Sequence, residues 1–423
     1  DDRTVREDDT LALAYGGGIF CVDKNCSDLV NRGAVVAGGE CQVLLKDLVM
    51  VNNTAGADGG AIYYEASYDR WLNFTRAVFE GNQALGEPPE DISEIWYPQQ
   101  HERCPCFEPF SLQSQAWGLG GAVYAAVQSV EFFEGATFTR NRARVAGGGL
   151  HICSRAESNE AWSTVGFKNC SLTDNRAGYA GSGGAAMLGS RGGAVHAAGQ
   201  WLETGLECCL LARNRAGTGG AVRWDVQDGA FCMASWWPLF ILSDNDSDVI
   251  GWPLARWPDL YAVRDKLMQL KAAPSEVRDN TAQEGDGGGI AIAAVRSAVI
   301  LVGTRFDNNT AAQGRGGGMA CSCKDCNILA AGAQFTSNNA TVAGGGLFAT
   351  GEGLNTTLLA ALLSNNSAAA GGGMMCHGGY STTLDGVLCT GNLADSYGGG
   401  AGEPPEDISY MWYPMQHERR PCF

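Results

Sequence analysis

The 423-residue sequence predicts an all-β protein, a solenoid of parallel strands with three short strands in each coil. Two motifs alternate along the chain: an apolar residue followed three positions later by asparagine, and two or three glycines followed by an apolar residue. The glycine runs that begin at Gly287, Gly316, Gly344, Gly371 and Gly398 are 29, 28, 27 and 27 residues apart. Helical solenoids would show apolar stripes with a 3.6-residue period, which these units lack.

The asparagine motif predicts one corner of each coil. Asparagine tolerates left-handed backbone conformations and hydrogen-bonds to its own turn. Stacked on every coil, the asparagines are expected to form a ladder that satisfies turn amides hidden from water, while the apolar residue fills the interior. The copies are Met50–Asn53, Phe79–Asn82, Phe138–Asn141, Leu172–Asn175, Leu211–Asn214, Leu242–Asn245, Val277–Asn280, Phe306–Asn309, Phe335–Asn338, Leu363–Asn366 and Cys389–Asn392.

The glycine runs predict places where the backbones of neighbouring coils come close, because glycine accepts positive φ and has no Cβ. The coil that starts at Met319 shows the expected layout: strands over 319–321, 327–330 and 333–336, a turn over 322–325, and a second turn beginning at Asn338. Such short strands pair with neighbours about 4.8 Å above and below, so about ten coils would form a rod roughly 45–50 Å long.

These two motifs resemble the repeats of the chlamydial polymorphic outer-membrane protein family, over roughly residues 14–400. Copies such as Gly59-Gly-Ala-Ile62 and Phe79–Asn82 carry the resemblance. It implies a right-handed parallel β-helix similar to the pectin-lyase-like folds, exposed at a cell surface and often adhesive.

Insertions interrupt the period at 86–118, 182–191 and 246–275. Residues 402–423 repeat residues 86–107 with 18 of 22 positions identical, so the chain is expected to be a single β-helix over 1–423 and a fragment of a longer one. The repeated segment is either a device for periodic lateral contacts or a duplicated surface loop. Within 246–275, an apolar face over 258–274 predicts a helix that packs on the adjacent coil.

Sixteen cysteines and nine Asn-x-Ser/Thr sequons favour an extracellular, disulfide-bonded glycoprotein. Cys323 and Cys326 have the spacing of half a zinc site, which is the alternative for that pair. Several sequons fall in the asparagine turn, so they could instead be by-products of the turn sequence. The sequons begin at Asn25, Asn52, Asn73, Asn169, Asn245, Asn308, Asn339, Asn355 and Asn365.

The formal net charge of −17 argues against nucleic acid and anionic membranes as partners, because their phosphates would be repelled. The longest apolar runs, such as 358–363, are far below the roughly 18 residues of a membrane span. We therefore expect no nucleic-acid partner and no membrane span.

The residue after each glycine-motif apolar residue forms a column that should face outward. It contains no acid, and the Asn-Thr-Asp and Gly-His-Gly signatures of solenoid hydrolases are absent from the sequence, which argues against catalysis. Tyr124, His151, His196 and Arg223 would form an aromatic and basic stripe for a glycan or an acidic partner, or simply a solvated face. The column is Phe20, Tyr63, Tyr124, His151, His196, Arg223, Ala291, Ala320, Phe348 and Met375.

Asp244, Asp246 and Asp248 resemble the start of a calcium loop, although Val249 and Ala255 occupy the positions of its glycine and glutamate. The sequence thus predicts no catalytic residue and no cofactor, with calcium at these aspartates and zinc at Cys323 and Cys326 left as alternatives.

We expect a non-catalytic extracellular scaffold, structural or adhesive, in a surface coat or appendage. Its partners would be other copies, other extracellular proteins or glycans. The alternatives are a secreted polysaccharide lyase or hydrolase of the pectin-lyase-like fold, which an acidic cluster across adjacent coils would favour, and a recognition module that uses the stripe or the insertions.

Overall fold

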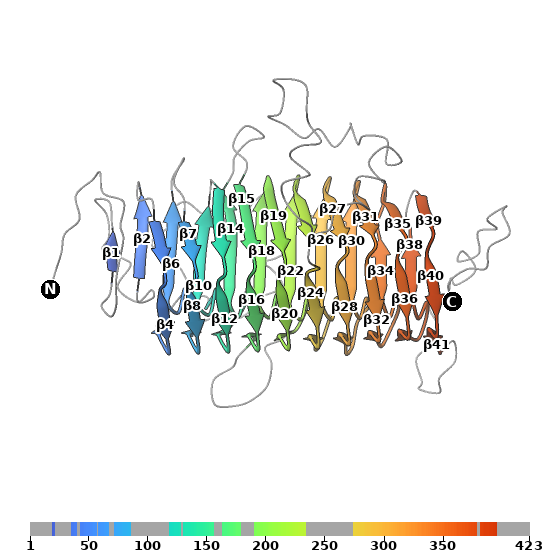
Figure 1. The fold of residues 1–423 in the computed structure, drawn as a ribbon, viewed down its shortest axis with the longest axis horizontal. Coiled ribbons are helices and arrows are strands. Elements are labelled where there is room, and N and C mark those ends of the chain that lie inside the picture. Colours follow the sequence, from blue (N-terminus) through green and yellow to red (C-terminus); the bar gives the residue numbers. More distant parts are fainter. Residues whose placement is uncertain are drawn as a thin grey trace, which may run out of the picture.

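The computed structural model describes residues 19–21, 35–39, 43–56, 58–66, 72–85, 118–127, 130–155, 163–178, 190–233, 274–378 and 381–395. Within these ranges all regular elements are β-strands, which form four parallel sheets stacked coil upon coil as a right-handed β-helix (Figure 1). This confirms the predicted fold class. No helix among these residues has the length and apolar character needed to cross a membrane.

Successive turns of the chain contribute one strand to each sheet, and every pairing is between neighbouring coils. Sheet I contains β1 (Ile19–Cys21), β2 (Val35–Gly39), β6 (Ile62–Ala66), β10 (Val123–Val127), β14 (Leu150–Arg155), β18 (Val195–Gln200), β22 (Val222–Gln227), β26 (Ile290–Val295), β30 (Met319–Lys324), β34 (Leu347–Thr350) and β38 (Met374–His377). Sheet II contains β3 (Val43–Lys46), β7 (Leu72–Thr75), β11 (Val130–Glu134), β15 (Ser163–Lys168), β19 (Leu202–Glu207), β23 (Ala230–Met233), β27 (Ala298–Val302), β31 (Asn327–Ala331), β35 (Asn355–Leu359) and β39 (Ser381–Asp385).

The other two sheets have shorter strands and lie on either side of the asparagine turn. Sheet III contains β4 (Val49–Val51), β8 (Val78–Glu80), β12 (Thr137–Thr139), β16 (Ser171–Thr173), β20 (Leu210–Ala212), β24 (Glu276–Arg278), β28 (Arg305–Asp307), β32 (Gln334–Thr336), β36 (Leu362–Ser364) and β40 (Leu388–Thr390). Sheet IV contains β5 (Thr54–Ala55), β9 (Gln83–Ala84), β13 (Arg142–Ala143), β17 (Arg176–Ala177), β21 (Arg215–Ala216), β25 (Thr281–Ala282), β29 (Thr310–Ala311), β33 (Asn339–Ala340), β37 (Ser367–Ala368) and β41 (Leu393–Ala394).

The three predicted strands per coil correspond to sheets I to III, and the two-residue strands of sheet IV add a fourth ladder that the sequence analysis missed. The predicted turn over 322–325 is wrong in its extent. Strand β30 continues through Lys324, and the left-handed residue of this turn is Asp325, with φ 54°. The strand is longer than expected because Cys321 and Cys323 both point into the apolar interior and continue its alternation.

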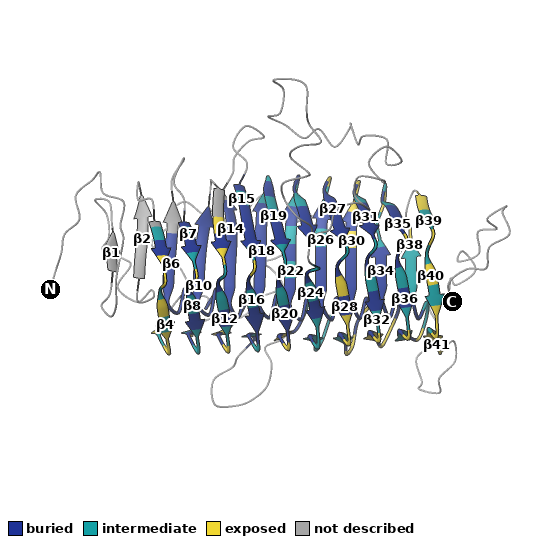
Figure 2. Ribbon diagram, viewed as in Figure 1, coloured by how far each residue is buried: buried dark blue, intermediate teal, exposed yellow. Residues whose placement is uncertain are grey.

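Aromatic side chains from the asparagine motif stack along the interior. The rings of Phe79 and Phe138 are 4.8 Å apart at 15°, and those of Phe306 and Phe335 are 4.7 Å apart at 6°. All four are fully buried, as expected for the interior of a close-packed rod. Figure 2 shows this burial along the middle coils, with more exposure at the last strands.

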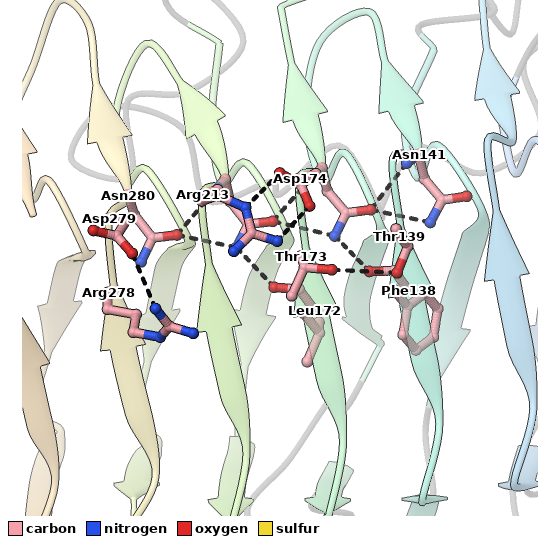
Figure 3. A network of polar contacts seen from close by, with 12 residues as sticks. Phe138, Thr139, Asn141, Leu172, Thr173, Asp174, Arg213, Arg278, Asp279 and Asn280 are labelled. Atoms are coloured by element: carbon pink, nitrogen blue, oxygen red, sulfur yellow. Dashed lines mark hydrogen bonds and ion pairs between the residues drawn. The ribbon is translucent and has the colours of Figure 1, made fainter.

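Between the two end rungs, the described motif asparagines from Asn82 to Asn366 are buried and hydrogen-bond to both neighbouring coils (Figure 3). The main-chain N–H and the side-chain Nδ2 of Asn141 each donate to Oδ1 of Asn175, at 3.0 Å. Nδ2 also donates to the carbonyl of Phe79 on the preceding coil, at 3.0 Å. The same pattern runs through Asn53, Asn82, Asn141, Asn175, Asn214, Asn280, Asn309, Asn338, Asn366 and Asn392.

The register corrects the position of two insertions. Asn214 donates directly to Asn280, so the ladder has no rung between them. The prediction of a rung at Leu242–Asn245 is therefore wrong, and that segment lies outside the described residues. Strand β23 ends at Met233 and β24 begins at Glu276, so this insertion starts earlier than the predicted 246. Arg191 bridges Ala146 and Thr218, which makes it part of a coil and not of the insertion predicted over 182–191.

Asn309→Ala should destabilise the protein strongly. It removes the acceptor of the Asn280 N–H and Nδ2, and it leaves the Val277 carbonyl without its donor. Buried unsatisfied groups cost about 1–3 kcal/mol each, so we expect a loss of at least about 3 kcal/mol in chemical denaturation.

The matched control is Asn308→Gly, because the neighbouring Asn308 is exposed and has φ 53°, a conformation that suits glycine. Similar, small losses for both variants would show that the ladder does not hold the coils together.

Candidate functional site

The predicted stripe stacks in register. Tyr124, His151, His196 and Arg223 are consecutive Cα partners on β10, β14, β18 and β22. The ring of Tyr124 lies 5.4 Å from that of His151 at 9°, and the two histidine rings are 4.8 Å apart. The interior is formed by the residues on either side of these, so the stripe points away from it, as expected.

The stripe nevertheless does not face solvent, and the expectation of an exposed outer face is wrong. Tyr124 is 9% exposed, His151 1% and His196 0%. The segment before each glycine run covers the column: Val145 packs against Tyr124, and Ala146 bridges Arg191 in a narrow extra ladder. The chain then reverses at the glycine run, where Gly147 has φ +65° and a Cβ would clash with the Leu150 carbonyl.

The two histidines form a directed hydrogen-bond chain. Nδ1 of His196 lies 2.9 Å from Nδ1 of His151, and Nε2 of His196 lies 3.1 Å from Oδ2 of Asp225. A carboxylate only accepts, so His196 donates from Nε2, and its Nδ1 must then accept a proton from Nδ1 of His151. Burial lowers the pKa of His151 far below its usual value, and the neighbouring His196 adds to this. Burial also lowers the pKa of His196, although Asp225 opposes the shift.

Asp225 is the anion that holds this chain in place. Arg223 Nε lies 2.6 Å from its Oδ1, and Arg191 donates to Oδ2 at 3.0 Å. Burial would raise the pKa of Asp225, but the charges of Arg223 and Arg191 and the hydrogen bond from His196 outweigh it and hold that pKa far below the usual range. The cluster is thus a buried, paired network of one carboxylate, two guanidinium groups and two neutral imidazoles.

Asp225 and Arg191 were missed by the sequence analysis. Asp225 follows Arg223 by two positions in β22, so strand alternation places both side chains on the same side of the sheet. A search of the second outward position of each strand would have found it. Arg191 belongs to the covering segment, and no pattern in the sequence assigns that segment to this face.

The arrangement can respond to protonation, and its two histidines are buried beneath the covering segment. No group of three or more His, Cys, Asp or Glu side chains in the described ranges could hold a metal ion. The calcium candidates Asp244, Asp246 and Asp248 lie outside those ranges. A binding role for Tyr124, His151, His196 and Arg223 stays a prediction, one that would require the covering segment to move.

The alternative of a lyase or hydrolase needs acids on neighbouring coils. Burial raises the pKa of Glu203 in β19 to about 7, against a hydrogen bond with Thr164 that lowers it. A glycosidase uses two such groups. The register partners of Glu203 are Thr164 and Ala230, so neither adjacent strand supplies a second carboxylate at this position.

The described cysteines fall into two groups. Cys323 and Cys326 form a disulfide bond with each other, which leaves neither thiolate for the zinc alternative, and Cys153 and Cys389 are also disulfide-bonded. Others are free thiols that serve as small hydrogen-bond donors: Cys170 Sγ contacts the Phe133 carbonyl at 3.1 Å, in the position where Ser275 Oγ contacts the Leu206 carbonyl on a later coil. The described cysteines that form no disulfide bond are Cys170, Cys208, Cys209, Cys232, Cys321 and Cys376.

The asparagines of the predicted sequons differ in their exposure to solvent. Asn52, Asn308 and Asn365 are exposed, occupy the same position of their coils directly before the ladder asparagine, and have φ of 55°, 53° and 54°. Asn169 and Asn339 are also exposed. Asn73 accepts the Phe132 N–H and Asn355 donates to Asn327, and both side chains are half-buried within strands. Asn25 and Asn245 lie outside the described residues.

Comparison with known families gives one match, to the Chlamydia polymorphic membrane protein repeat, over residues 47–65. This segment contains one asparagine motif, Met50–Asn53, and one glycine motif, Gly59–Ile62. It therefore confirms the resemblance, with Gly59–Ile62 among the copies that suggested it. No curated protein and no solved structure matched the chain.

Stability should fall as pH drops below about 6.5. Burial lowers the folded-state pKa of both His151 and His196, so the unfolded chain binds protons in a range where the folded protein does not. Each histidine then contributes about 1.4 kcal/mol per pH unit, lost as pH falls from about 6.5 toward the folded pKa.

The measurement is the denaturation midpoint of the wild type and of the His151→Phe/His196→Gln variant between pH 7.5 and 5, with the exposed His377→Gln as control. The double variant should lose this part of the pH dependence and the control should keep it. Equal pH dependence in all three would show that the buried pair does not titrate on unfolding.

Proposed function

We propose that this protein is a non-catalytic extracellular scaffold, a glycosylated rod in a cell-surface coat or appendage that presents sites to proteins or glycans. The observation that carries the proposal is the unbroken stack of in-register coils, which turns a flexible chain into a straight support with repeated positions along its outside. The matched repeat supports a surface location, since its family is one of membrane-associated surface proteins. The disulfide between Cys323 and Cys326 supports an oxidising compartment.

The mechanism is geometric. A parallel β-helix has no hinge between coils, because each coil is hydrogen-bonded to the next on four sheets and through the asparagine ladder. Side chains at the same position of successive coils are about 4.8 Å apart. A ligand group or a glycan attached at such a position is held at a fixed height and angle on the rod, which suits multivalent contact at a surface.

The proposal places glycans along one edge. Asn52, Asn308 and Asn365 project from the same turn position on different coils, between sheets III and IV. Asn308 Nδ2 contacts Asp279 at 2.8 Å, an exposed hydrogen bond that a glycan can replace at small cost. The competing explanation is that these sequons are by-products of the turn sequence. Each consists of the left-handed asparagine, the ladder asparagine and a following Thr or Ser, all of which the turn itself favours.

Protein secreted from a eukaryotic host should carry glycans at Asn52, Asn308 and Asn365 and none at Asn355. A glycan on Asn355 would break its bond to Asn327 between β35 and β31 and hinder folding. Isotope-labelled enzymatic deglycosylation followed by peptide mass spectrometry measures occupancy at each site. Occupied Asn355 with a bare edge column would contradict the placement.

The surface role is tested on intact source cells by brief protease treatment and mass spectrometry of the released peptides. We expect peptides of this chain to appear together with known surface proteins and without a cytoplasmic marker. Appearance only after lysis would contradict the proposal. Turnover of uronic-acid polysaccharides by the purified chain would support the secreted lyase or hydrolase instead.

A further inference from the structure

Two cysteines occupy the same position on adjacent coils, at the corner between sheets II and III. The strands on both sides of this corner are in register, since β15 pairs with β19 before it and β16 pairs with β20 after it. Cys170 and Cys209 are therefore stacked one coil apart, with their Cα atoms about 4.8 Å from each other. Both are buried in the apolar interior. We call these two residues the cysteine pair.

The sulfur of Cys209 already reaches the coil of Cys170. Cys209 Sγ contacts the carbonyl oxygen of Phe167 at 3.4 Å, and Phe167 lies in β15, on the coil of Cys170. The side chain of Cys209 also hydrogen-bonds to both the main chain and the side chain of Cys170. The two thiols thus meet across the boundary between the coils.

Hydrogen bonding alone does not require cysteine in this column. Ser275 occupies the same position on the next coil, and its Oγ donates to the Leu206 carbonyl at 3.2 Å. Thr304 follows one coil later, and its Oγ1 donates to the Met233 carbonyl at 3.2 Å. A hydroxyl therefore makes the same contact that each thiol makes. What two stacked cysteines add is a pair of sulfurs that can be oxidised together.

We propose that the cysteine pair is a redox site that closes to a disulfide bond between the two coils. A disulfide joins Cα atoms about 4.4–6.8 Å apart, and the stacking of parallel strands provides about 4.8 Å. Closure requires Cys170 Sγ to turn away from the Phe133 carbonyl, which it contacts at 3.1 Å, and toward the coil of Cys209. The resulting bond would join the coils of β15 and β19 covalently.

The oxidant is a disulfide of the surroundings, either oxidised glutathione or the disulfide of a thiol oxidoreductase. The Cys170 thiolate attacks one sulfur of that disulfide and expels a thiolate, which takes up the proton that Cys170 lost. Cys209 then attacks the Cys170 sulfur of the mixed disulfide and releases the second thiol in the same way. Two protein thiols are oxidised, and one external disulfide is reduced to two thiols.

The two thiols suit these two steps. The hydrogen bond with Cys209 lowers the pKa of Cys170, which makes Cys170 the first nucleophile, whereas burial raises the pKa of Cys209 well above its usual value. Because both sulfurs are buried, exchange takes place while the coils assemble or when this corner opens locally. The inference rests on the proposed function only for the oxidising compartment in which the pair meets its oxidant.

The test is refolding of the full chain in buffers with graded ratios of oxidised to reduced glutathione. Remaining thiols are alkylated, glycans are removed, and linked peptides are identified by mass spectrometry. We expect Cys170 to be linked to Cys209. Cys209→Ser should abolish the link, and Cys208→Asn should keep it, because Asn169 occupies the equivalent turn position with the same φ of 54°.

Two other cysteine pairs serve as internal controls. Cys323 and Cys326 should be linked, which shows that oxidation has reached buried thiols. Cys321 and Cys376 point into the same interior but are two coils apart, about 9.6 Å, which is too far for a disulfide. Absence of the Cys170 link while Cys323 and Cys326 are linked overturns the proposal. Equal linking of Cys321 to Cys376 also overturns it, because the stacked geometry would then not select the pair.

The matched variant for stability is Cys170→Ser/Cys209→Ser, since serine makes the required contact at position 275. Under reducing conditions its thermal midpoint should equal that of the wild type. Under oxidising conditions the wild type should unfold a few degrees higher than the variant, because the added bond restricts the unfolded chain. The same oxidative shift in both proteins would contradict the proposal. Refolding uses purified protein, so this result and the surface location on cells can fail independently.

Discussion

The asparagine ladder is the interaction on which the rest of the molecule depends. The tight corner of each coil leaves main-chain groups inside a rod that water does not reach, and such groups must be paired. One buried side chain does this for three coils at once: Oδ1 of Asn309 accepts from the rung before, its own N–H and Nδ2 donate to the rung after, and Nδ2 also reaches the Val277 carbonyl. The ladder fixes the register of every strand that leaves the corner.

Because the coils stack in register, polar and charged residues at the same coil position form columns along the axis of the rod. A substitution at one coil position meets only the same position on the coils above and below, so identical or complementary residues can accumulate along the axis. This rod shows two results of that rule outside its apolar interior: the alternating turn charges around Asp174 and Arg213, and the covered chain from Tyr124 to Asp225. Each set consists of residues far apart in sequence that the coil period brings together.

The period made the fold and the stacking predictable, because the asparagine and glycine residues that mark it are required by backbone geometry. Other features were not predicted from the sequence, for physical reasons. The predicted column omitted Val36, which pairs with Phe20 and Tyr63, because the sequence before β2 has the single Gly33 instead of a run of glycines. The Leu242–Asn245 copy was accepted because four residues match by chance more easily than a whole coil. The burial of His151 and His196 could not be anticipated, as the covering segment around Ala146 has no periodic signal of its own.

The covered cluster and the exposed turns show two ways of pairing cations with acids on this rod. Around Asp225, two arginines and a histidine converge on one buried carboxylate, an arrangement that is costly to break and that ties three coils and their covering segment together. On the surface the same pairing is simpler: Arg213 makes a bidentate ion pair with Asp174 on the coil before, and water screens both groups, so this pair costs little to break. The buried cluster therefore fixes the register of its coils far more strongly than the exposed pair does.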